Sequence, residues 1–190
     1  MFSVLHVNTR SVLAHNNATK LDEIELLAAE YNFAVVWLTE TWLENSIDNV
    51  TVQLNGYADL FRLDLHGGGV LAYVKNDIFF VRLFDFESND VEILWLELKT
   101  TNFRCLYIAV CYLPNSNTLL KQKFTDSLST VLALLLVDPN RLVWLLVTSM
   151  ITLYSNQFSF SQTFFVLCQH LAFINLSTLL HEIVWFWTGL

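Results

Sequence analysis

Residues 33–42, FAVVWLTETW, decide how this chain folds, because an unbroken apolar run ends abruptly in polar residues. β-Branched and aromatic side chains fill residues 33–38, which is typical of a strand buried on both faces. In layered α/β proteins, ligands collect beyond the ends of such strands. We therefore expect Glu40 to stand where chemistry is done, although a lone glutamate there is most often a solvated carboxylate.

Strands outnumber helices on both sides of this segment. Apolar residues recur at helical spacing over residues 21–31 and 117–137, and residues 19–22 form a capping box before the first helix. Residues 70–75 and 78–86, separated by a short turn, predict a β-hairpin. A short apolar opening strand is predicted at residues 2–8 and an alternating strand at 92–98. Buried apolar strands are predicted at 104–112 and 141–147. The class is therefore α/β, with two sheets or one large sheet covered by helices.

Composition limits the kind of protein. The 190 residues carry 18 acidic and 10 basic side chains, a net charge of −8, and 54% of the residues are hydrophobic. The apolar content excludes a disordered chain, and the acidic balance excludes a basic DNA-binding domain of the histone or homeodomain type. Residues 1–10 do not resemble a secretory signal. The cysteines show neither metal spacing nor an even disulfide set, which favours an intracellular, nuclear or cytoplasmic location; they are Cys105, Cys111 and Cys168.

Few single positions indicate chemistry by themselves. No zinc spacing, phosphate-binding loop ending in lysine, or nucleophile elbow occurs, and the histidines show no metal pairing. Residues 67–69, GGG, lead into a predicted strand and not a helix, so backbone freedom in a turn explains them better than phosphate binding. Asn8 alone would be a turn or cap residue, and Tyr112 alone would be a core aromatic.

Four sequence blocks nevertheless occur in a fixed order. They are NTRS at residues 8–11, LTETWL at 38–43, GGGV at 67–70 leading into YVK, and YLPN at 112–115. Over about residues 4–142 they resemble the endonuclease/exonuclease/phosphatase family, most closely the endonuclease domain of LINE-type (non-LTR) retrotransposons. The resemblance implies a four-layer α/β/β/α sandwich of the DNase I-like type, incomplete at its C-terminal side. It also implies hydrolysis of phosphodiesters, with DNA as the partner of intact relatives and Mg²⁺ or Mn²⁺ as cofactor.

The same resemblance assigns roles to three residues. Glu40 matches the family's metal-binding glutamate, and Asn8 matches the asparagine that supports the metal through its amide. Tyr112 matches the tyrosine whose hydroxyl approaches the scissile phosphate. A hard cation prefers oxygen ligands and keeps several waters, so one carboxylate at a strand end is a reasonable anchor. Metal and donors together would stabilise the charge of the pentacovalent transition state.

Two sequence blocks of the family do not occur in this sequence. One is Gly-Asp-Phe-Asn, whose aspartate activates the attacking water, and the other is the later Ser-Asp-His. Charged residues also become rare after residue 142, where the first missing block is expected: Glu182 is the only charged side chain in residues 143–190. Read one base out of frame, codons for residues 146–152 can spell Gly-Asp-Phe-Asn-Asp-His. We therefore interpret residues 1–142 as the N-terminal part of the family's domain and residues 143–190 as an out-of-frame apolar tail. We expect that tail to have low order or to form a poorly packed helix.

Other interpretations remain open. Residues 163–187 are long enough to cross a bilayer, but they contain polar side chains and Glu182 and lack flanking Lys or Arg, so we expect no membrane partner. The chain as written should have no significant nuclease activity, because nothing remains to activate the water. The alternatives are a non-catalytic remnant with a hydrophobic tail and a phosphatase of the same family.

Overall fold

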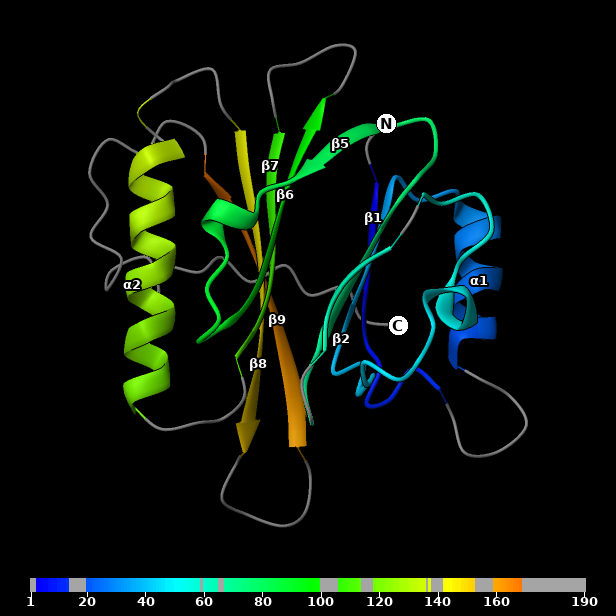
Figure 1. The fold of residues 1–190 in the computed structure, drawn as a ribbon, viewed down its shortest axis with the longest axis horizontal. Helices are drawn as coiled ribbons and strands as arrows, with labels where there is room; N and C mark the ends of the chain where they lie inside the picture. The colour runs from blue at the N-terminus through cyan, green and yellow to red at the C-terminus, as the bar shows by residue number, and fades with distance from the viewer. Residues whose placement is uncertain are drawn as a thin grey trace. The chain divides into compact units, whose positions relative to one another are not determined.

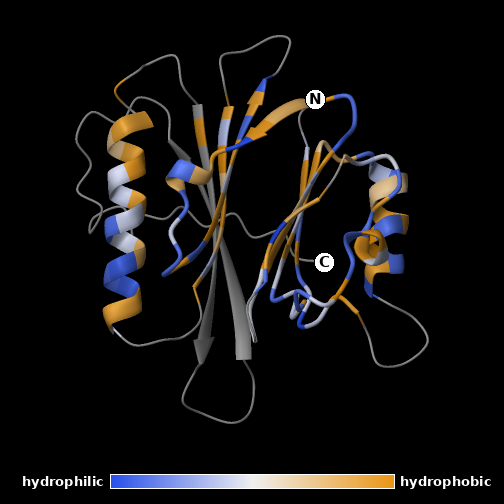
Figure 2. Cartoon of the chain, in the orientation of Figure 1, coloured by the Kyte–Doolittle hydropathy of each residue, from blue (hydrophilic) through white to orange (hydrophobic). Residues whose placement is uncertain are grey.

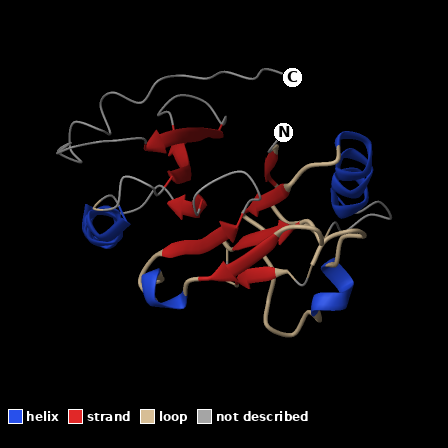
Figure 3. Cartoon of the chain, turned by 90° about the horizontal axis from the view of Figure 1, so that it is seen from above, coloured by secondary structure: helices blue, strands red, loops and turns tan. Residues whose placement is uncertain are grey.

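The structure is a computed structural model that describes most of the chain in two compact units, Met1–Phe80 and Val81–Leu190. Each unit contributes one sheet and one α-helix (Figure 1; Figure 3). From residue 144 onward, and at residue 142, only the backbone is described. The described residues are 3–13, 20–58, 60–64, 67–99, 106–113, 118–135, 137, 142–152 and 159–168.

The first unit is built on a four-stranded sheet. Its described elements are β1 (Val4–Asn8), α1 (Lys20–Tyr31), β2 (Val35–Thr39), the 3-10 helix η1 (Asn49–Val52), β3 (Phe61–Leu63) and β4 (Val70–Val74). The strand order is β1-β2-β4-β3. β1 and β2 are parallel, and β4 runs antiparallel to both β2 and β3. The carboxyl ends of β1, β2 and β3 therefore meet at one end of this sheet.

Local sequence explains the elements of this unit. Every residue of β2 is buried, as the apolar run predicted. α1 confirms the helix expected over residues 21–31 and buries Leu21, Ile24 and Ala28, one stripe at helical spacing. Figure 2 shows the apolar side of α1 and the apolar strands as the hydrophobic parts of the unit. The capping threonine expected at residue 19 lies outside the described residues.

The second sheet has five strands, in the order β5-β6-β7-β8-β9. The elements are β5 (Phe79–Arg82), the 3-10 helix η2 (Phe84–Phe86), β6 (Glu92–Lys99), β7 (Leu106–Leu113), α2 (Thr118–Leu135), β8 (Leu142–Thr152) and β9 (Ser159–Cys168). β7 and β8 are parallel and joined through α2, whereas β6 and β9 run antiparallel to their neighbours. α2 packs on β6 and β7 through Phe124, Leu128, Val131, Leu132 and Leu135.

The predicted hairpin is wrong. Residues 70–75 supply β4 of the first sheet, but Phe79–Arg82 forms β5 of the second sheet, and Phe84–Phe86 is 3-10 helical. The reason is that β4 is already paired on both edges, by β2 and β3, and has no free edge to offer β5. Strand proximity in the sequence predicts pairing only while an edge is open.

Part of the apolar tail also differs from expectation. β8 runs from Leu142 to Thr152 without a break at residue 143, and β9 pairs with it along ten residues. The expected helix is therefore wrong for residues 143–152 and 159–168, which form strands. An apolar run next to the open edge of β7 satisfies its backbone groups by extending the sheet. Residues 169–190 lie outside the described part, and the division at residue 142 stays a prediction. No helix in the described part of the chain is long and apolar enough to cross a membrane.

Candidate metal centre

The structure brings Asn8 and Glu40 into direct contact at one end of the first sheet. Asn8 is the last residue of β1 and lies opposite Thr39, the last residue of β2. Glu40 follows directly, so both side chains leave the sheet at the carboxyl ends of neighbouring parallel strands. The Asn8 amide nitrogen, Nδ2, donates a hydrogen bond to Glu40 Oε1 at 2.6 Å.

Glu40 is an unusual carboxylate because it is only 1% exposed and takes part in no ion pair among the described residues. Its backbone has φ 53°, the left-handed region that residues other than glycine rarely adopt. Two neighbours hold it there: Thr9 Oγ1 donates to the Glu40 carbonyl oxygen at 3.0 Å, and the Ser11 amide donates to it at 2.8 Å. Backbone held in such a conformation by its surroundings is typical of functional sites.

Asn8 supplies a second oxygen to the same place. Its Oδ1 is buried and has no hydrogen-bond partner, while its Nδ2 is fixed on Glu40. An unpartnered buried acceptor beside an unpaired buried carboxylate fits a cation that prefers oxygen ligands, such as Mg²⁺ or Mn²⁺. Within the described ranges, no group of three or more His, Cys, Asp or Glu is placed to hold a metal. Further ligands would therefore be waters or substrate oxygens.

The glycine run shapes this end of the sheet. Gly67 and Gly69 have φ of 76° and 94°, which explains two of the three glycines by backbone conformation. The carbonyl oxygens of Gly69 and Gly68 accept hydrogen bonds from the amides of Thr41 (3.3 Å) and Trp42 (2.9 Å). The turn therefore holds the two residues that follow Glu40, in agreement with the preference for backbone freedom over phosphate binding.

Sequence reasoning missed Asp64, which lies at the same end of the sheet. Leu63 of β3 pairs with Val70 of β4, and Val70 also pairs with Thr39 of β2. Asp64 directly follows Leu63 and Glu40 directly follows Thr39, so both carboxylates leave the sheet at the same end. Arg62 Nε lies 3.2 Å from one Asp64 oxygen, and the other, Oδ1, is buried without a partner. Burial raises the pKa of Asp64, and the Arg62 guanidinium partly offsets this. In the sequence, only the position of Asp64 shortly before the glycine run could have indicated this location. The strand before it, β3, has three residues and no recognisable pattern.

Tyr112 belongs to the second unit. It lies on β7, is 3% exposed, and is opposite Glu92 of β6 and Thr148 of β8. Ser149 is likewise opposite Leu113. The stretch that replaces the expected Gly-Asp-Phe-Asn block therefore runs beside Tyr112 in the same sheet. The approach of Tyr112 to Asn8 and Glu40 stays a prediction.

Comparisons with known proteins add to this geometry. No protein-family model matches the chain, and no curated protein matches it either. Solved structures do match. D. rerio TDP2 complexed with single-strand DNA product is 18% identical with a TM-score of 0.55, covering 77% of this chain and 59% of that one. An AP endonuclease from Archaeoglobus fulgidus is 16% identical with a TM-score of 0.53, covering 77% and 56%. An endonuclease/exonuclease/phosphatase family protein from Leptotrichia buccalis is 14% identical with a TM-score of 0.50, covering 78% and 66%.

The chain has the DNase I-like fold. At these identities the likeness establishes the fold alone, and it confirms the α/β class and fold type expected from the sequence. The chain spans between 56% and 66% of the length of these endonuclease/exonuclease/phosphatase neighbours. The shared fold assigns no role to any residue of this chain. The metal-binding role expected for Asn8 and Glu40 is supported by their contact, whereas the role of Tyr112 rests on the sequence resemblance alone.

Proposed function

We propose that this chain is a metal-binding, catalytically degenerate relative of the DNase I-like phosphodiesterases, of LINE-type retrotransposon origin, whose intact relatives nick DNA. One observation carries the proposal: Glu40 is a buried carboxylate without a cation among the described residues, in contact with Asn8, whose own oxygen is unpartnered. An uncompensated buried charge is strongly unfavourable, and a divalent cation supplies the missing compensation.

The choice of DNA rests on two supports. One structural neighbour was solved with a single-strand DNA product, and another is named an AP endonuclease. The NTRS, TETW and GGGV blocks favour the retroelement branch over phosphatases of the same fold. A phosphate monoester or lipid phosphate would not explain those blocks.

Each residue at the site has a separable task. When bound, the divalent cation neutralises negative charge on a phosphate oxygen. Glu40 and Asn8 Oδ1 would hold that cation, and Asn8 Nδ2 fixes the orientation of the carboxylate by its hydrogen bond. Thr9 and Ser11 hold the backbone of Glu40, so the oxygens are in place before a ligand arrives. Tyr112 is the proposed donor to a phosphate oxygen.

Turnover is not expected from this chain. On the sequence match, Thr148 and Met150 of β8 take the positions of the aspartate and the asparagine in the family's Gly-Asp-Phe-Asn block, whose aspartate activates the water. Thr148 is opposite Tyr112. A hydroxyl cannot replace a carboxylate base near neutral pH, and a positioned base contributes about 10²–10⁴-fold to the rate. The chain should therefore retain metal binding and lose hydrolysis.

Calorimetric titration of the full chain with Mn²⁺ and Mg²⁺ tests the proposal, with Glu40→Gln as the variant and Glu44→Gln as the matched control. Glu44 lies in the same loop but is exposed. We expect metal to bind the native chain and the control and to raise their melting temperatures, and Glu40→Gln to abolish both effects. Equal binding by Glu40→Gln would overturn the metal centre. Plasmid nicking that needs metal and disappears in Glu40→Ala would overturn the claim of inactivity.

A further inference from the structure

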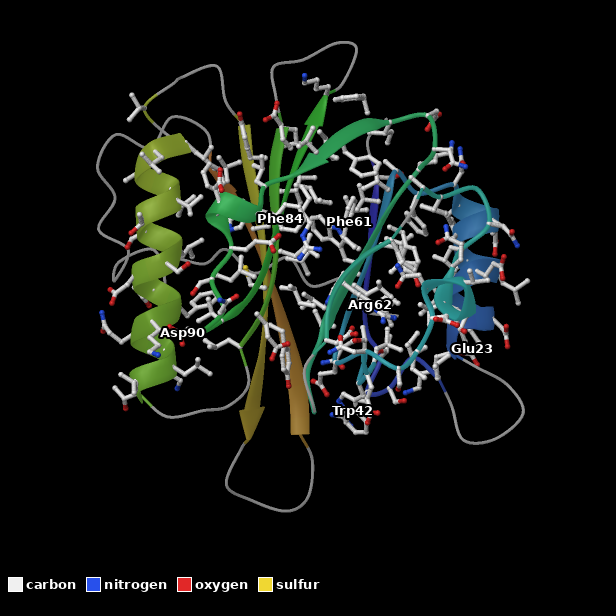
Figure 4. The ribbon with its side chains drawn as sticks, in the orientation of Figure 1. Glu23, Trp42, Phe61, Arg62, Phe84 and Asp90 are labelled. Atoms are coloured by element: carbon white, nitrogen blue, oxygen red, sulfur yellow. The ribbon has the colours of Figure 1, made fainter. Side chains whose placement is uncertain are left out.

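The side chain of Trp42 is exposed to solvent next to the candidate metal centre. Its side chain is 49% exposed, whereas Thr41 before it and Leu43 after it are 1% and 2% exposed. Figure 4 shows Trp42 at the end of the first unit, beyond the last residues of β2. Trp42 follows Glu40 by two residues, so the two Cα atoms are within about 7 Å of each other.

The backbone that carries this indole is fixed on both sides. Trp42 has φ 52°, and its amide donates to the Gly68 carbonyl oxygen at 2.9 Å. Leu43 is anchored in the hydrophobic core of the first unit. A non-glycine residue keeps a left-handed conformation only where its surroundings impose it. The indole is therefore presented from a rigid loop, which lowers the entropy lost when a ligand binds.

Positive charge lies on the neighbouring segment. The amides of Ser11 and Val12 donate to the carbonyl oxygens of Glu40 and Thr41, so residues 9–12 run alongside the loop that carries Trp42. Arg10 is exposed on that segment, and the Lys20 ammonium contacts the Arg10 carbonyl oxygen at 3.1 Å. Two cationic side chains, Arg10 and Lys20, therefore lie on or beside the segment next to the Trp42 loop.

We propose that Trp42 is a stacking platform for an unpaired nucleobase of single-stranded DNA whose phosphate lies at Asn8 and Glu40. Exposed aromatic rings combined with cationic side chains are the means by which proteins hold single strands. A base inside a duplex already has both faces covered, so the platform selects an unpaired base and is tolerant of sequence. This inference rests on the proposed function for the position of the phosphate.

The experiment measures binding of a short single-stranded oligonucleotide to the full chain in EDTA, by fluorescence anisotropy. A 2-aminopurine in the oligonucleotide reports stacking by its quenching. Trp42→Ala should weaken binding about tenfold and lose the quenching, whereas Trp42→Phe should keep most of both. Tyr31→Ala is the matched control, because Tyr31 is a 60% exposed aromatic on α1, and it should change neither.

Several results would overturn the platform. Native affinity and quenching in Trp42→Ala would do so, as would an equal loss of affinity for a duplex or for an oligonucleotide lacking bases. Repeating the anisotropy titration in Mg²⁺ instead of EDTA separates this inference from the proposed function. Mg²⁺ should tighten binding by the native chain. If Mg²⁺ has no effect while Trp42→Ala still weakens binding and loses the quenching, only the proposed function is refuted.

Discussion

Removing either partner of the Arg82–Glu87 ion pair should destabilise the second unit strongly. Arg82 Nε donates to Glu87 Oε1 at 2.9 Å and Arg82 Nη2 donates to Oε2 at 2.8 Å, in a two-pronged arrangement. The two side chains are only 12% and 10% exposed. The Trp95 backbone amide also donates to Glu87 Oε1, at 3.3 Å. The pair therefore connects Arg82 of β5 with the backbone of β6 at Trp95, through groups that are almost fully buried.

The expected size of the effect follows from this burial. A hydrogen bond to a charged group contributes roughly 1.5–3 kcal/mol, and two of them are lost at once. Truncating one partner leaves the other charge buried and alone, so Arg82→Met or Glu87→Met should each lower the free energy of unfolding by about 3–5 kcal/mol. The double variant leaves no orphan charge. The double variant should therefore lower the free energy of unfolding by far less than the two single variants do in sum. The coupling energy should be about 2 kcal/mol or more.

Urea unfolding of the four proteins near neutral pH, followed by far-ultraviolet circular dichroism, measures these quantities. Repeating the series at high salt should change the coupling little, because a buried pair is poorly screened. The reasoning fails if each single variant costs less than about 1 kcal/mol, as an exposed pair does. It also fails if the double variant equals the sum of the two single variants.

Three further outcomes are expected. Burial lowers the pKa of His6 from 6.5 to about 4, so between these values the unfolded chain binds a proton that the native chain excludes. Because His6 is partly buried, stability should be at most roughly 2 kcal/mol lower at about pH 5 than at about pH 7.5, and urea titrations of His6→Gln should show a flatter slope. Gly69→Ala, at φ 94°, should cost roughly 1–2 kcal/mol and weaken metal binding in calorimetry. Gly56→Ala, at φ 84° but away from the site, should cost a similar amount without the binding defect. Thr9→Val removes the hydroxyl that holds Glu40 and should weaken metal affinity, whereas Thr9→Ser should restore it, and equal affinities in both would contradict the role given to Thr9.

The sequence alone determined the elements whose signal is local. The apolar run at residues 33–38 is long enough and β-branched enough to specify β2, and helical spacing specifies α1 and α2 within one or two residues at most ends. It also predicted that Glu40 would follow a buried strand at the sheet's end. These features depend on burial of side chains a few residues apart, and that periodicity is written directly in the chain.

Tertiary structure decided everything that depends on which edges and surfaces are already occupied. β5 follows β4 in the chain but joins the other sheet, since both edges of β4 are taken. β8 and β9 extend the second sheet although their residues carry almost no charge. Strand register and loop pairing bring Asn8 against Glu40, bury an oxygen of Asp64 at the same end of the sheet and expose Trp42. Register joins residues tens of positions apart through backbone hydrogen bonds, which are the same for every sequence and therefore leave no local pattern to detect.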